Sequence, residues 1–116
     1  MKLAYTAGQY RNPELYGVVT NIRRAELVAI ELWRLGIPTI CPHKNTALLD
    51  GSLHPGDSDV WLKGDLEMLR RCDCVVMIPG WEQSEGAKAE KEFAVEHNIP
   101  IFYWPMDKEE LAMFRG

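Results

Sequence analysis

The chain has 116 residues, enough for one domain with a single hydrophobic core, and its 47% hydrophobic and 26% charged residues are typical of soluble globular proteins. The formal net charge of -4 argues against a surface that binds long nucleic acids, although a single nucleotide needs only a few local donors. No apolar run approaches the roughly 18 residues of a membrane span. Three cysteines without a CxxC pair favour a reducing compartment. We therefore expect a soluble, cytoplasmic protein without a membrane or nucleic-acid polymer as partner.

The first half of the chain begins with a short apolar run at residues 2–7, which predicts a strand. Residues 20–35 have apolar side chains at helical spacing, with Thr20 or Asn21 as the N-cap. A second strand is expected at residues 37–41, before a proline that ends it.

Residues 42–57 show little periodicity and predict a long loop. Loops of this length in a compact domain are usually functional or disordered, and we expect a substrate lid or a subunit contact over residues 42–59. A helix capped by Asp57, Ser58 or Asp59 should follow and end at about Arg71.

The second half of the chain starts with a near-continuously apolar run at residues 73–78, which is typical of a buried strand in a parallel sheet. Ser84 is suited to cap a helix that ends at about Asn98. A fourth strand at residues 99–104 and a short helix at 107–114 complete the prediction.

This alternation of strands and helices predicts a single α/β domain over residues 1–116, with a parallel sheet and right-handed crossovers. Ligands of such sheets bind beyond the carboxyl ends of the strands. The loops after Ala7, Cys41 and Ile78 should therefore surround one crevice.

Two carboxylates occupy positions where an amphipathic helix should be apolar. Glu90 lies three residues from both Ala87 and Phe93, and Asp65 lies inward by the same spacing in the preceding helix. A buried carboxylate is costly unless it is paired, hydrogen-bonded or at a polar cleft. The pair suggests a site, and the alternative is that each residue caps a loop or pairs with an arginine.

Other side chains near the predicted crevice could hold an anion or a base. Ser84 and the free amides at its helix start could bind a phosphate, or Ser84 could be an ordinary N-cap. Arg11 is a candidate phosphate or carboxylate fork, or a surface arginine. Tyr10 and Trp81 could stack on a base or cover the core.

Two familiar kinds of site do not fit the sequence. No GxGxxG follows the first strand, so the dinucleotide fingerprint is absent. His43, His54, Asp50 and Asp57 have metal-binding side chains, but their spacing fits no standard metal site.

Several short motifs together resemble the nucleoside 2-deoxyribosyltransferase superfamily, which includes deoxynucleoside 5'-monophosphate N-glycosidases. Residues 7–11 read AGQYR and residues 41–46 read CPHKNT. The strongest match comprises Asp65, the strand-opening Asp73 eight residues later, and the S-x-G-x-x-x-E pattern at 84–90. The resemblance covers nearly the whole chain and is nearest to a small branch that is common in phage genomes.

The resemblance implies a flavodoxin-like, Rossmann-like three-layer sandwich with a four- to five-stranded parallel sheet. It also implies a homodimer or larger homo-oligomer and neither a metal nor an organic cofactor. The substrate would be a small nucleoside or nucleotide.

The resemblance also assigns roles to residues. Glu90 would be the nucleophile that attacks the anomeric carbon, Asp65 the partner acid/base, and Tyr10 the residue that orients the sugar or the nucleophile. The family often has Gly-Tyr directly before the nucleophile, whereas this chain has Lys88 and Ala89 there, so Tyr10 is a candidate substitute. The residues expected to bind the substrate are Gly8, Arg11, His43, Asn45, Trp81, Ser84 and Gly86.

The expected function is cleavage of the N-glycosidic bond of a nucleoside 5'-monophosphate through a glycosyl-Glu90 intermediate. Arg11 and Ser84 favour a phosphorylated substrate and hence hydrolysis. One alternative is base exchange on free nucleosides, and the other is a nucleotide-sensing module without turnover, against which the presence of both Glu90 and Asp65 argues.

Overall fold

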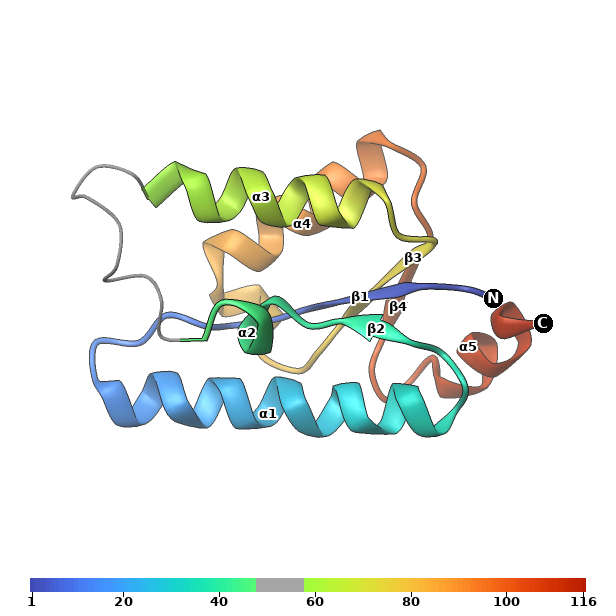
Figure 1. The fold of residues 1–116 in the computed structure, drawn as a ribbon, viewed down its shortest axis with the longest axis horizontal. Helices are drawn as coiled ribbons and strands as arrows, with labels where there is room; N and C mark the ends of the chain where they lie inside the picture. Colours follow the sequence, from blue (N-terminus) through green and yellow to red (C-terminus); the bar gives the residue numbers. More distant parts are fainter. Residues whose placement is uncertain (48–57) are drawn as a thin grey trace.

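The chain forms an alternating series of helices and strands, as its pattern predicts (Figure 1). The computed structural model describes residues 1–47 and 58–116, so Asp50, His54, Asp57 and most of the predicted loop lie outside the described residues. In chain order the elements are β1 (Ala4–Ala7), α1 (Leu15–Arg34), β2 (Thr39–Ile40), α2 (Pro42–Asn45), α3 (Ser58–Arg70), β3 (Cys74–Met77), a 3-10 helix (Trp81–Gln83), α4 (Glu85–Glu96), β4 (Ile101–Tyr103) and α5 (Lys108–Arg115).

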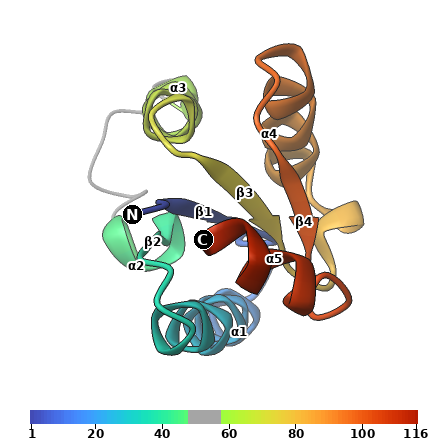
Figure 2. The same cartoon turned by 90° about the vertical axis from the view of Figure 1, so that its right-hand side faces the viewer.

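The four strands form one parallel sheet with the order β2-β1-β3-β4. Helices α1 and α5 cover one face of the sheet, and α3 and α4 cover the other (Figure 2). The three-layer α/β fold with a parallel sheet is therefore confirmed. The strand order changes direction at β1 and β3, which places the expected ligand crevice beyond their carboxyl ends.

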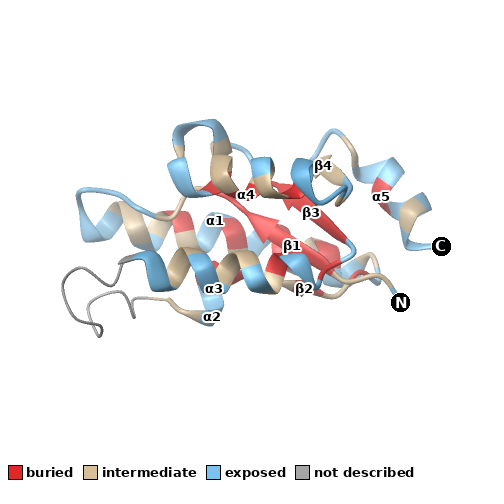
Figure 3. Cartoon of the chain, turned by 90° about the horizontal axis from the view of Figure 1, so that it is seen from above, coloured by how far each residue is buried: buried red, intermediate tan, exposed pale blue. Residues whose placement is uncertain are grey.

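The central strands β1 and β3 are buried along their whole length (Figure 3). Successive side chains of a strand point to opposite faces of the sheet. Accordingly Ala4 packs into the core beneath α1, whereas Tyr5 and Ala7 pack into the core beneath α3 and α4. This alternation puts a tyrosine, the largest side chain of the strand, on the face that carries Glu90.

Two elements differ from the sequence prediction. Helix α1 begins at Leu15 rather than near Thr20, and Thr20 lies inside the helix, where its hydroxyl donates to the Tyr16 carbonyl oxygen. The sequence pattern does not predict the first turns of α1, because their apolar side chains are exposed and do not continue the buried face of the helix. Residues 42–45 form the short helix α2 rather than a loop, with Pro42 in the first turn, where its missing N–H is not needed.

Among the described residues, no helix combines the length and the apolar character needed to cross a membrane.

Candidate functional site

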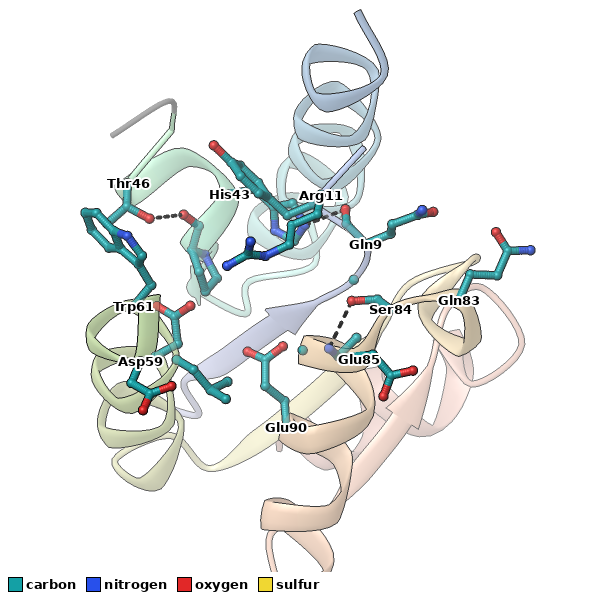
Figure 4. Close-up of a pocket in the computed structure, with 17 residues that line it drawn as sticks. Gln9, Arg11, His43, Thr46, Asp59, Trp61, Gln83, Ser84, Glu85 and Glu90 are labelled. Carbon is teal, nitrogen blue, oxygen red and sulfur yellow. Dashed lines mark hydrogen bonds between the residues drawn. The ribbon is translucent and has the colours of Figure 1, made fainter. Parts of the chain in front are cut away.

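A cavity of about 500 Å³ opens beyond the carboxyl ends of β1 and β3 (Figure 4). Its wall combines the loop after β1, helix α2, the start of α3 and the first turns of α4. The three loops that the sequence predicts around one crevice therefore do meet. The cavity lies in the size range of small-molecule sites. The described lining residues are Gly8, Gln9, Tyr10, Arg11, Pro42, His43, Thr46, Asp59, Trp61, Leu62, Asp65, Gln83, Ser84, Glu85, Gly86, Ala87 and Glu90.

Glu90 lies at the base of this cavity, and Figure 4 shows its carboxylate pointing from α4 into the open space. The residue is only 7% exposed, and no ion pair with a cation of the described part of the chain holds it. Its Oε2 accepts a hydrogen bond from the hydroxyl of Tyr5, which is itself fully buried in β1. A buried carboxylate that faces a cavity and has one neutral donor is suited to chemistry rather than to structural pairing.

The electrostatics of the site come from burial. Loss of solvent raises the pKa of Glu90 to about 8; the hydrogen bond from Tyr5 opposes this rise, and the nearby charge of Asp65 adds to it. Burial also raises the pKa of Asp65 to about 6. Burial and the neighbouring Glu90 raise the pKa of Tyr5 far above its usual range, so Tyr5 stays a neutral donor. The two carboxyl groups therefore titrate near neutrality, where proton transfer can serve catalysis.

Asp65 lines the same cavity from α3, whereas Glu90 lines it from α4. It is half-buried, and its charge adds to the raised pKa of Glu90. Because both side chains line one cavity, the two inward carboxylates belong to one site. Asp73, the third acidic residue of the motif after Asp65 and Glu90, lies at the far end of the sheet, where its carboxylate accepts a 2.7 Å hydrogen bond from the Leu3 amide. The motif thus contains two acids at the cavity and one that joins the segments before β1 and β3.

The start of α4 forms the other side of the cavity. The Ser84 side chain accepts a 3.1 Å hydrogen bond from the Ala87 amide, so Ser84 is the N-cap of this helix. Its hydroxyl proton remains available, and the Glu85 and Gly86 amides have no acceptor within the helix. These donors face a concave region that already has Arg11 on its rim (Figure 4). The arrangement can hold an anion.

The loop after β1 provides Gly8, Tyr10 and Arg11. A Cβ atom at Gly8 would lie 2.3 Å from Cγ1 of Ile78, so only glycine lets the end of β1 pass the end of β3 this closely. Tyr10 contacts the ring of His43 edge-on, with 5.9 Å between ring centroids. Arg11 is exposed and extends over the cavity.

His43 is part of the wall and also supports it. The residue is 5% exposed, and its Nε2 donates a 2.9 Å hydrogen bond to the Gln9 carbonyl oxygen, which fixes the β1 loop to α2. Burial lowers the pKa of His43, so the ring is neutral near pH 7. A neutral ring that donates through Nε2 cannot also donate through Nδ1.

Two residues expected to bind the substrate lie away from the cavity. Trp81 packs against Tyr103 at 5.8 Å between ring centroids, with the Lys91 ammonium 4.5 Å above its ring. Asn45 is exposed on α2, and its side-chain amide points toward the Met68 sulfur. Trp81, in the 3-10 helix after β3, packs on the core side toward Tyr103, and Asn45 is the last residue of the short helix α2.

Two residues at the site were not predicted from the sequence. Trp61 lines the cavity from α3, one helical turn before Asp65 and therefore on the same face. Tyr5 lies within a predicted strand, and the sequence pattern gives it no further role. Because a buried tyrosine hydroxyl needs a partner, the inward carboxylate of Glu90 was the signal that could have linked the two residues.

The fold of the chain is shared with a solved protein structure. Its structure matches that of a 2-deoxyribosyltransferase from Bacillus psychrosaccharolyticus with a TM-score of 0.60 at 20% sequence identity. The match covers 87% of this chain and 70% of the other. At this identity the likeness establishes a common fold.

The family follows from the sequence match. The model of the family described as domain of unknown function DUF4406 matches residues 21–103, more than half of the chain, and the chain belongs to this family. The family is related to nucleoside 2-deoxyribosyltransferase, so the predicted superfamily is confirmed, while the phage-associated branch stays a prediction. No curated protein matches the sequence at a significant level.

Proposed function

We propose that this protein cleaves the N-glycosidic bond of a nucleoside 5'-monophosphate through a covalent glycosyl intermediate on Glu90. The observation that supports this most directly is the buried Glu90 carboxylate, which faces a cavity that also contains Asp65. Two carboxyl groups with separate surroundings are what glycoside cleavage with a covalent intermediate requires.

In the first step, Oε1 of Glu90 attacks the anomeric carbon of the sugar. The Tyr5 hydroxyl occupies Oε2, which leaves Oε1 free for the new bond. As the C–O bond to Glu90 forms, the C–N bond to the base breaks, and Asp65 donates its proton to the departing nitrogen. The developing positive charge on the sugar favours the ionised form of Glu90.

In the second step, the Asp65 carboxylate accepts a proton from a water molecule. The hydroxide oxygen bonds to the anomeric carbon, the C–O bond to Glu90 breaks, and the free sugar phosphate leaves. Both carboxyl groups then return to their starting protonation states. The first step requires ionised Glu90 and protonated Asp65. Without substrate, the higher pKa of Glu90 places the shared proton on Glu90, so substrate binding must move this proton to Asp65, and the positive charge that develops on the sugar favours that transfer.

The phosphate would lie at the start of α4. Arg11 supplies a charged fork, and the Ser84 hydroxyl and the amides of Glu85 and Gly86 supply neutral donors. The Trp61 ring offers an apolar surface for the base beside Asp65.

A specific observation favours a second candidate, base exchange on free nucleosides. The Asp59 and Glu85 carboxylates also line the cavity, and their negative charge opposes a phosphate dianion. The structural neighbour is a 2-deoxyribosyltransferase, which favours the same alternative. In that reaction a second base, rather than water, attacks the glycosyl-Glu90 intermediate.

The two candidates are separated by a release assay over a panel of nucleosides and 5'-monophosphates, each with and without a second free base. Free base and sugar phosphate from monophosphates support the proposal, whereas a new nucleoside that contains the added base supports the alternative. The Glu90→Gln variant, which keeps an acceptor for Tyr5, should be inactive and form no glycosyl adduct by intact-mass spectrometry. Tight binding of a nucleotide without turnover would instead identify a sensing module.

The phosphate site has its own test. Arg11→Gln should raise KM for a monophosphate by about tenfold or more and leave KM for the matching nucleoside unchanged, since the lost fork meets only the phosphate. Arg24→Gln, which removes an exposed arginine of α1 far from the lining residues, is the control. Equal effects of Arg11→Gln on both substrates would contradict the assignment.

A further inference from the structure

The outer side of α1 carries large apolar side chains in solvent. The core side of this helix is formed by small and aliphatic residues, and the opposite side faces away from the sheet with no described element beyond it (Figures 1 and 2). Tyr16 is 80% exposed and Trp33 is 60% exposed. The exposed apolar residues of α1 are Leu15, Tyr16, Val19, Leu27, Ile30 and Trp33.

Four of these side chains form a stripe along the helix with Arg23 in its middle. Tyr16, Val19, Arg23, Ile30 and Trp33 recur at separations of three, four, seven and three residues, which keeps them on one face of a 3.6-residue helix. Exposed apolar groups gathered on one helix face around a polar centre are typical of an interaction site.

The stripe is complementary to the same stripe of a second copy that runs in the opposite direction. Consider a two-fold axis that crosses α1 midway between Arg24 and Ala25. Positions at equal distances from this point face each other in an antiparallel pair of helices. Tyr16 then lies opposite the partner's Trp33, and Val19 opposite the partner's Ile30.

The charges in the middle of the stripe follow the same symmetry. Arg23 lies opposite the partner's Glu26, and Glu26 lies opposite the partner's Arg23. Within one chain these two residues form an ion pair of 2.5 Å, so their side chains already lie at the same place on the helix surface. In an antiparallel pair both charges gain an opposite charge from the partner, whereas a parallel pair would put like charges together.

We propose that two copies of this chain associate through an antiparallel pairing of their α1 helices. We infer that the partner is a second copy of this chain. A single two-fold rotation brings the apolar residues, the cation and the anion of the stripe each opposite a complementary residue of the partner. The pairing leaves the cavity open, since α1 covers the sheet face opposite to α3 and α4.

A covalent trap tests this geometry directly. In the Val19→Cys/Ile30→Cys double variant, the thiol introduced at position 19 of one chain faces the thiol introduced at position 30 of the other. Mild oxidation should therefore link two chains by disulfide bonds. Each single variant should stay unlinked, because identical positions in the antiparallel pair are about 16 Å apart along the axis. The native cysteines Cys41, Cys72 and Cys74 are buried, so the wild-type chain is the background control.

Sedimentation equilibrium provides the non-covalent test. The wild-type chain should be a dimer, and Val19→Lys should weaken dimerisation on the order of a hundredfold, because each dimer carries the buried charge twice. Val95→Lys, at an even more exposed position on α4, should have no effect. Circular dichroism should show that both variants keep the fold.

A monomer at every soluble concentration, or a dimer that Val19→Lys does not weaken, would overturn the proposal. So would cross-linking that is as efficient in either single cysteine variant as in the double variant. None of these results affects the outcome of the release assay, so the proposed interface and the proposed function are tested independently.

Discussion

The Tyr5 hydroxyl donates a hydrogen bond from the middle of β1 to Oε2 of Glu90, 85 residues later in the chain. The strand fixes the donor and the helix fixes the acceptor, so the carboxylate has one oxygen held and one toward the cavity. This bond also opposes the burial that raises the pKa of Glu90.

Removal of this donor should change the pH dependence of catalysis. Tyr5→Phe keeps the buried ring but loses the hydrogen bond that favours ionised Glu90, so the pKa of Glu90 should rise further. The acidic limb of the kcat/KM profile should then move to higher pH, by about one to two units, since a hydrogen bond to a charged group contributes about 1.5–3 kcal/mol. A uniform loss of activity with an unmoved limb would mean that Tyr5 serves only packing.

Replacement of the second carboxylate should move the same limb in the opposite direction. The charge of Asp65 adds to the raised pKa of Glu90, so Asp65→Asn should lower that pKa and shift the acidic limb to lower pH. Loss of the proton donor should reduce kcat by about 10²- to 10⁴-fold. A substrate with a less basic leaving group should lose less. A profile identical to that of the wild-type chain would exclude Asp65 as the acid.

The buried carboxylate should also make folding stability depend on pH. A glutamate has a pKa of 4.5 when solvated, whereas burial raises that of Glu90 to about 8. The unfolded chain therefore releases this proton first, so the stabilisation by the protonated form is complete below pH 4.5 and is lost as the pH rises to about 8. By pH 7 the loss should be on the order of 3 kcal/mol.

Urea unfolding between pH 5 and 8 measures this effect when the wild-type chain is compared with Glu90→Gln. The variant cannot ionise and should become more stable than the wild-type chain as the pH rises, with the Asp65 contribution left in place. A constant difference in the free energy of unfolding across this range would show that Glu90 titrates at its ordinary pKa when folded.

Substitution of Gly86 can distinguish an effect on folding stability from an effect on substrate binding. A Cβ atom there meets nothing closer than the Ser84 hydroxyl at 3.8 Å, so the protein alone does not require glycine. Gly86→Ala should raise the free energy of unfolding by up to about 1 kcal/mol, as expected for alanine in a helix, and should raise KM if the substrate anion contacts this backbone.

Gly64→Ala on α3 is the matched control, because Gly64 is a helical glycine too and a Cβ atom there meets nothing within 4 Å. It should give the same gain in stability with an unchanged KM. An unchanged KM in Gly86→Ala as well would place the anion elsewhere.

Much of the architecture followed from local pattern. The strands were predicted because near-continuous apolar runs such as residues 73–78 are typical of a strand buried on both faces. The inward positions of Glu90 and Asp65 followed from helical spacing, since residues three and four apart share a face. The start of α1 did not follow, because its exposed apolar residues break the simple rule that apolar side chains are buried.

The sequence by itself determined the alternation of strands and helices and the two carboxylates that face inward, because both depend on residues close together in the chain. Only the tertiary structure decided that Tyr5 holds Glu90, that Trp61 lines the cavity and that Trp81 packs against Tyr103 instead. The physical reason is that these relations join elements far apart in sequence. Their distance and direction are set by how the helices pack on the sheet, which no local periodicity encodes.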